Sequence, residues 1–144
     1  MNNSLVETKD INSLIGGRGK TEIITTIEDM KTIYNLDNKV DFKINDCKGE
    51  VIKVKDVLLK VFDIPEKCDE NGNVIVEKET KKITILVSDK GASYVTASKV
   101  FANQLLTLIS YFGIEKLKGG FTIKIIEKTM KNSKNKALGF ELLD

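Results

Sequence analysis

The 144-residue sequence contains no histidine and no tryptophan. Without histidine, the chain lacks the commonest general base and the commonest ligand of transition metals. Carboxylates and lysines alone can build an active site, but no paired-carboxylate or nucleophile pattern stands out in the sequence. We therefore expect a protein without catalytic activity, without a metal and without a cofactor.

Long apolar segments are also missing. No run approaches the roughly 20 apolar residues that cross a bilayer, and the first ten residues, MNNSLVETKD, lack the apolar core of a signal peptide. Cysteine is scarce, because Cys47 and Cys68 stand alone and form no C-x-x-C pair. We expect both thiols to be reduced and structural, in an intracellular, cytoplasmic protein without membrane contact.

The net charge of +2 is too small to indicate a nucleic-acid partner by itself, but the charge is segregated. Residues 63–79 carry six acids and two lysines, whereas residues 116–144 carry seven lysines and three acids. The distribution of charge matters more than its sum for such a partner. The C-terminal part is therefore the basic part of the chain.

A glycine-rich stretch, SLIGGRGKTEII at 13–24, ends in Gly-Lys-Thr like a phosphate-binding loop. The P-loop pattern requires a glycine five residues before Gly19, and this position is Leu14. The preceding residues are polar and show no strand pattern. We therefore reject a nucleotide hydrolase and expect residues 1–22 to form a flexible, basic tail.

Periodicity predicts mainly strands after this tail. A short helix is expected within 25–38, where Thr26 and Asp29 resemble a capping box, followed by a strand at 40–46. The next strand, 49–65, changes its alternation phase midway, as a bulge or bend does. A long connection with an Asn71-Gly72 turn signal follows. Two hairpins are then expected, from the segments 81–89 with 92–98 and 121–130 with 137–143.

A helix separates these two hairpins. Ser98 is a favourable N-cap and Gly113 a typical C-terminal glycine. Four apolar residues lie on one helical face: Phe101, Leu105, Leu108 and Phe112. We expect Phe101, Phe112, Phe121 and Phe140 to be core residues.

This order predicts an OB-fold at residues 23–144: five antiparallel strands with a helix between the third and the fourth. Residues 23–48 would then be a helix and strand extension of that domain. Closing the sheet into a barrel would bury its apolar face and remove its edges, with the helix covering one end.

From Gly49 to Leu143 the chain resembles the small OB-fold single-stranded-DNA-binding proteins of Gram-positive phages and conjugative plasmids. The resemblance rests on KKITILVSDKGASYVTAS, KVFANQLLTLISYF and FTIKIIEKTMKNSKNKALGFELL. It implies a partner, single-stranded DNA, and no enzymatic activity.

OB domains bind ligands on the face of strands 2 and 3 and in two loops, and single strands are held by cations and aromatic rings. The residues that we expect to contact DNA are Tyr94, Lys53, Lys55, Lys82, Lys90, Lys124, Lys128, Lys131, Lys134 and Lys136. Tyr111 lies off the apolar stripe of its helix and is a weaker candidate.

Cooperative binding along a strand is usual for such proteins. The tail carries apolar residues that would anchor it on a neighbouring copy: Leu5, Val6, Ile11, Leu14 and Ile15. The expected function is sequence-tolerant binding of single-stranded DNA in plasmid conjugation or in phage or plasmid replication. An OB-like module that binds a protein of a secretion or replication complex is the alternative, which the small net charge and the few aromatics favour.

Overall fold

A computed structural model describes residues 21–129 and 136–143. Its described part forms two compact units: residues 21–23 with 60–82, and residues 24–59 with 83–129 and 136–143. The predicted tail therefore lies almost wholly outside the described residues, although β1 begins at Thr21, inside it. None of the described helices is long and apolar enough to span a membrane.

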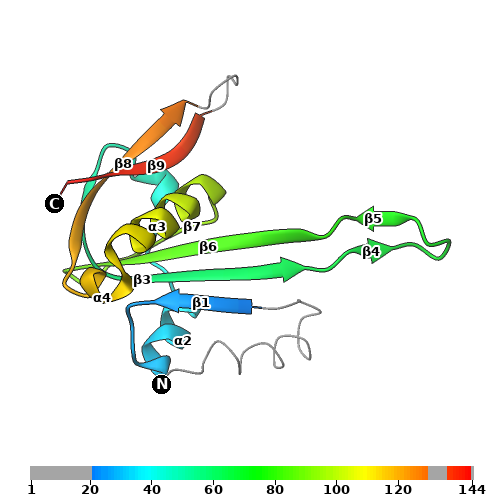
Figure 1. The fold of residues 1–144 in the computed structure, drawn as a ribbon, viewed down its shortest axis with the longest axis horizontal. Helices are drawn as coiled ribbons and strands as arrows, with labels where there is room; N and C mark the ends of the chain where they lie inside the picture. The colour runs from blue at the N-terminus through cyan, green and yellow to red at the C-terminus, as the bar shows by residue number, and fades with distance from the viewer. Residues whose placement is uncertain (1–20, 130–135, 144) are drawn as a thin grey trace. The chain divides into compact units, whose positions relative to one another are not determined.

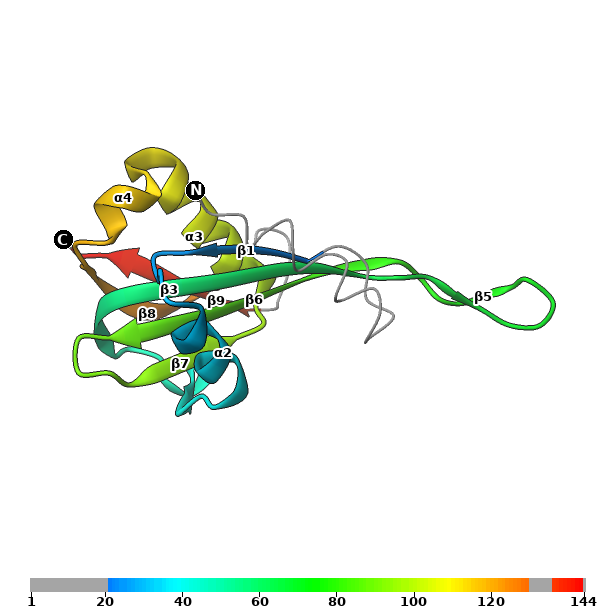
Figure 2. The same cartoon turned by 90° about the horizontal axis from the view of Figure 1, so that it is seen from below.

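The protein is mainly β, with a sheet that curls into a half-barrel compatible with an OB-like fold (Figures 1 and 2). Five strands follow the order predicted from the sequence: β3 (Val51–Ile64), β6 (Glu79–Ser88), β7 (Ser93–Thr96), β8 (Phe121–Thr129) and β9 (Lys136–Leu142). Helix α3 (Lys99–Phe112) lies between β7 and β8 in the chain, and α4 (Ile114–Leu117) follows it.

The sheet is more open than the closed barrel that the sequence predicts. Its strand order is β2-β7-β6-β3-β8-β9, and β1 (Thr21–Thr25) pairs with β3. Within the described residues no ladder joins β7 to β9. The second edge of β7 is instead occupied by the parallel strand β2 (Phe42–Lys43), with Phe42 opposite Tyr94.

Local sequence signals account for the β6–β7 hairpin and for α3. Gly91 has φ +87° in the turn, a conformation that costs a glycine little, and Leu86 pairs with Tyr94 across the hairpin. The Ser98 side chain accepts a hydrogen bond from the Phe101 N–H (3.2 Å). Both features lie where the sequence predicts them.

The residues before β3 differ from the prediction. Helix α2 (Met30–Asn38) begins after Asp29, whose side chain caps it. Thr26 is not the cap, because its hydroxyl donates to Asp56 Oδ1 (2.9 Å) and accepts from the Val57 N–H (3.0 Å). The predicted strand 40–46 is reduced to β2, followed by the 3-10 turn η1 (Ile44–Asp46). Contacts with distant residues thus override the local pattern.

The 66–80 connection contains a two-stranded ribbon around the Asn71-Gly72 turn signal. Strands β4 (Lys67–Cys68) and β5 (Val74–Val76) pair, and Gly72 in the turn has φ +82°. Asp69 Oδ1 accepts the N–H groups of Asn71 (2.8 Å) and Asn73 (2.9 Å). These bonds lower the pKa of Asp69, that from the Asn73 backbone most strongly. The turn of the ribbon is therefore fixed by hydrogen bonds to the Asp69 carboxylate, which these bonds favour in its ionised form.

The core of the larger unit forms between α3 and the sheet. Phe101 is fully buried, and its ring centroid lies 4.9 Å from that of Phe140 on β9. Phe121 is also buried, as expected. Phe112 is 42% exposed, so its assignment to the core is wrong. It lies at the last turn of α3, which borders open cavities rather than packed strands.

Gln104 of α3 joins the helix to the edge strand β9. Its amide donates to the Phe140 carbonyl (2.9 Å), and its oxygen accepts from the Phe140 N–H (3.0 Å). The side chain thereby replaces a neighbouring strand at this residue. Gly139 permits the approach, since a Cβ there would lie 2.6 Å from Gln104 Oε1 and 2.7 Å from Lys128 Cδ.

We therefore expect Gly139→Ala to lower the free energy of unfolding by about 1–3 kcal/mol, the usual cost of overpacking. Urea titration measures the loss. The control is Gly119→Ala, where the new Cβ would meet its nearest atom at an ordinary 3.5 Å. Equal stability of the two variants would contradict the role given to Gly139.

Candidate nucleic-acid interface

The exposed face of β3 and β8 carries three lysines. Lys53 and Lys55 alternate along β3 with buried Ile52 and Val54, as strand geometry requires. On β8, Lys124 is exposed on the same face, because Val51 pairs with Lys124 and Lys53 with Thr122. Within the described residues these three lysines form no ion pair, although exposed Glu141 of β9 lies opposite Lys124 in the sheet. We call Lys53, Lys55 and Lys124 the lysine face.

A cavity of about 420 Å³ adjoins the lysine face. Lys53, Lys55 and Thr122 line one part of it together with one acid, Asp89, and residues 118–120 line another. Gly120 has φ +90°, and a Cβ there would lie 3.2 Å from the Val54 carbonyl. The chain therefore passes close to β3 at this point and brings a further lysine, Lys118, beside the face.

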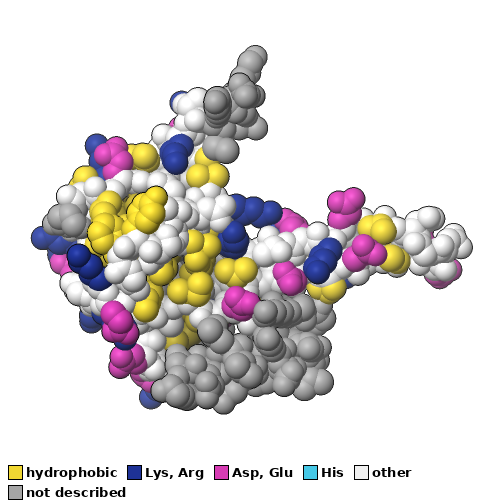
Figure 3. Space-filling model, viewed as in Figure 1, with side chains coloured by type: hydrophobic (Ala, Val, Ile, Leu, Met, Phe, Trp, Pro, Cys, Tyr) yellow, Lys and Arg dark blue, Asp and Glu magenta, His cyan; other side chains and the backbone are white. Residues whose placement is uncertain are grey.

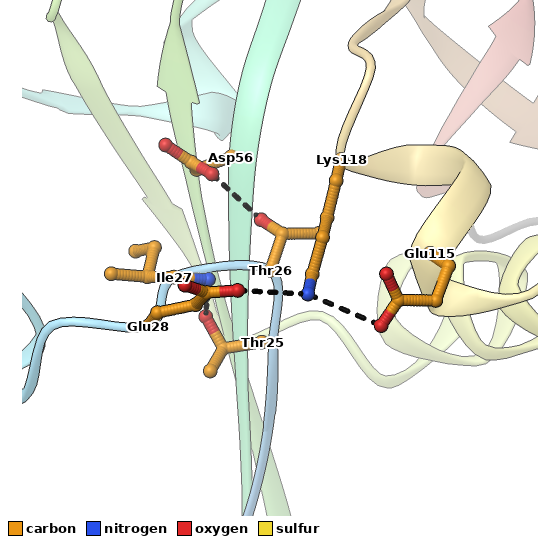
Figure 4. A network of polar contacts seen from close by, with 7 residues as sticks. All are labelled: Thr25, Thr26, Ile27, Glu28, Asp56, Glu115 and Lys118. Carbon is orange, nitrogen blue, oxygen red and sulfur yellow. Dashed lines mark hydrogen bonds and ion pairs between the residues drawn. The ribbon is translucent and has the colours of Figure 1, made fainter.

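Lys118 is held by two carboxylates. Its Nζ lies 3.2 Å from Glu115 of α4 and 3.2 Å from Glu28, which precedes α2 (Figure 4). The hydrogen bonds to Glu115 and then to Glu28 raise the pKa of Lys118. Two negative charges thus offset its positive charge, so Lys118 is a weaker candidate for phosphate contact than the three lysines of the lysine face. Sequence reasoning missed this contact because Glu28 lies 90 residues away.

Tyr94 lies in a different environment from the lysine face. Its ring stacks on Phe42, with centroids 5.3 Å apart. These rings line a cavity of about 390 Å³ that also contains Asp41, Asp46 and Glu50 and shares no lining residue with the cavity described above. Burial, and then the nearby Cys47 and acids, raise the pKa of Tyr94. Stacking on Phe42 occupies part of the ring that was expected to receive a base.

The lysines of β8 and β9 differ in their ion pairs and in the surface on which they lie. Lys136 lies 3.6 Å from Glu127, which also pairs with Lys48 at 2.6 Å. Hydrogen bonding and charge from Lys48, with a smaller effect of Lys136, lower the pKa of Glu127. Lys128 instead lies over Gly139 beside α3. Lys136 is thus partly neutralised, while Lys128 belongs to a different surface.

The remaining residues that were predicted to contact DNA lie away from the lysine face or outside the described residues. Lys90 is exposed in the β6–β7 turn, and Lys82 is half-buried near the middle of β6, in the smaller unit. Lys131 and Lys134 lie outside the described residues, as do the tail residues Leu5, Val6, Ile11, Leu14 and Ile15. Among residues 21–129 and 136–143, no group of three or more His, Cys, Asp or Glu side chains has the arrangement of a metal site.

OB-like sheets commonly bind oligonucleotides or oligosaccharides, and here the curled sheet carries the lysine face. The chain matches the Phi29 phage SSB family, described as phage single-stranded DNA-binding protein, over residues 20–142. The protein belongs to this family, whose members bind single-stranded DNA and are generally not enzymes. No curated protein and no solved structure matches the chain.

Proposed function

We propose that the protein binds single-stranded DNA with little sequence preference, with the phosphates lying along the lysine face. The observation that carries this proposal is the position of Lys53, Lys55 and Lys124 on one exposed face of two paired strands, where none of the three forms an ion pair among the described residues. Lysine contacts to phosphate are independent of base identity. Family membership supports the choice of single-stranded DNA.

Fluorescence anisotropy of a labelled thymidine oligomer, compared with a duplex of equal length at two salt concentrations, tests this function. We expect the oligomer to bind more tightly than the duplex and its affinity to fall steeply as salt rises, because phosphate contacts release counterions. Absence of binding in dilute buffer would overturn the proposal and would favour the alternative, an OB-like module for a protein partner.

The cellular role belongs to the same proposal. We place the protein in the cytoplasm, coating DNA during plasmid conjugation or during phage or plasmid replication. We also propose a likeness to the conjugation-plasmid protein PrgE, which favours conjugation, whereas the family description names a phage protein. Strand coating is common to both processes, so the binding chemistry is the same.

Self-association through residues 1–15 completes the proposed mechanism. Tethering an apolar segment to a neighbour on the same strand raises its effective concentration there. A deletion of residues 1–15 leaves β1 intact, because β1 begins at Thr21. The melting temperature should therefore stay unchanged. The number of copies assembled on a long oligonucleotide, measured by analytical ultracentrifugation, should fall. Unchanged assembly would remove the tail from the mechanism.

A further inference from the structure

A groove between α3 and β9 lies on the larger unit and has no role in the function proposed above. It is an open groove with a volume of about 590 Å³. The two hydrogen bonds between Gln104 and Phe140 hold its walls together. The residues that line it are Val100, Asn103, Gln104, Thr107, Leu108, Tyr111, Phe112, Lys128, Phe140 and Leu142.

The groove exposes large apolar side chains to solvent. Tyr111 is 79% exposed, Phe112 42% and Leu142 41%. A second cavity of about 250 Å³ shares Leu108, Phe112 and Leu142 with the groove and reaches Lys116. Figure 3 shows hydrophobic side chains gathered on this face of the larger unit. Exposed apolar side chains that adjoin one another are a common feature of binding surfaces.

The charges around the groove indicate which kind of ligand it binds. Two lysines border the surface: Lys128 in the groove and Lys116, whose Nζ lies 5.4 Å from the centroid of the Phe112 ring. No carboxylate lines either cavity among the described residues. Asn103, Gln104 and Thr107 add hydrogen-bonding groups to the walls. An occupant with flat apolar rings, polar edges and negative charge fits this lining.

We propose that this groove receives unpaired bases of single-stranded DNA, so that the strand contacts α3 as well as the lysine face. A base stacks on Tyr111, and the flanking phosphates lie near Lys116 and Lys128. This inference rests on the proposed function but uses other residues, since the groove shares none with the lysine face. Aromatic stacking with nearby lysines is the usual combination in single-strand binding.

Tyrosine fluorescence provides a direct test, because the chain has three tyrosines and no tryptophan. The double variant Tyr34→Phe/Tyr94→Phe leaves Tyr111 as the sole tyrosine. Titration with a thymidine oligomer should quench its emission, since a stacked base lies on the ring. The matched control, Tyr34→Phe/Tyr111→Phe, reports only Tyr94 and should be quenched less. Binding by anisotropy with unchanged Tyr111 emission would overturn the inference.

A second measurement separates direct contact from an indirect effect. Tyr111→Ala should weaken the affinity for the thymidine oligomer at least about fivefold, the lower end of a stacking contact. Tyr111→Phe should retain affinity because it keeps the ring. If the wild type binds the oligomer and Tyr111→Ala binds equally well, Tyr111 does not stack on a base and the inference is wrong. If the wild type does not bind, the proposed function and this inference both fail.

Discussion

Replacing Lys53, Lys55 and Lys124 together with glutamine is expected to weaken binding to a thymidine oligomer at least about tenfold at low salt. Each phosphate that a lysine neutralises contributes roughly 0.7 to the slope of log affinity against log salt for single strands. The triple variant should therefore lose about 2 from this slope. Anisotropy titrations at several salt concentrations measure both quantities.

The control for this variant keeps the same change of net charge. Lys31, Lys39 and Lys78 are exposed and lie outside the lysine face and the α3–β9 groove. Their replacement with glutamine should alter the affinity far less and leave the slope nearly unchanged. Equal losses in the two triple variants would show that net charge, and not the lysine face, carries the binding.

Phe101→Ala should lower the free energy of unfolding by about 3–5 kcal/mol, the usual cost of removing a buried phenylalanine. Phe101 is fully buried and packs on Phe140, so the substitution leaves a cavity between α3 and β9. Chemical unfolding followed by circular dichroism measures the loss.

Tyr111→Ala is the matched control on the same helix. Its ring is 79% exposed, and alanine favours helix more than tyrosine does, so the free energy of unfolding should stay within about 0.5 kcal/mol of the wild type. A loss below about 1 kcal/mol in Phe101→Ala would contradict the core that the structure assigns to this helix.

Much of the fold was predictable because its signals are local. Alternation in β3 separates Lys53 and Lys55 from the buried residues between them, and this pattern identified two members of the lysine face. The turn at Gly91 and the cap at Ser98 are likewise encoded within a few residues of where they act.

The candidate site was less predictable because it depends on pairing between distant strands. The register that places Lys124 beside Lys53 joins residues far apart in the chain. The sequence indicated Tyr94 as a DNA contact, but not that β2 would place Phe42 on its ring. The acids near Tyr94 are also remote in sequence, and no local pattern reveals them.

The sequence alone determined which residues form the main strands and α3, where the hairpin turns, and which side of β3 carries lysine. These properties depend on backbone preference and side-chain alternation, which act over a few residues. Only the tertiary structure decided that β2 occupies the edge of β7, that Lys118 is held by Glu28, and that Phe112 stays exposed. Each of these depends on surfaces that meet only after the chain has folded, so neighbouring residues do not encode it.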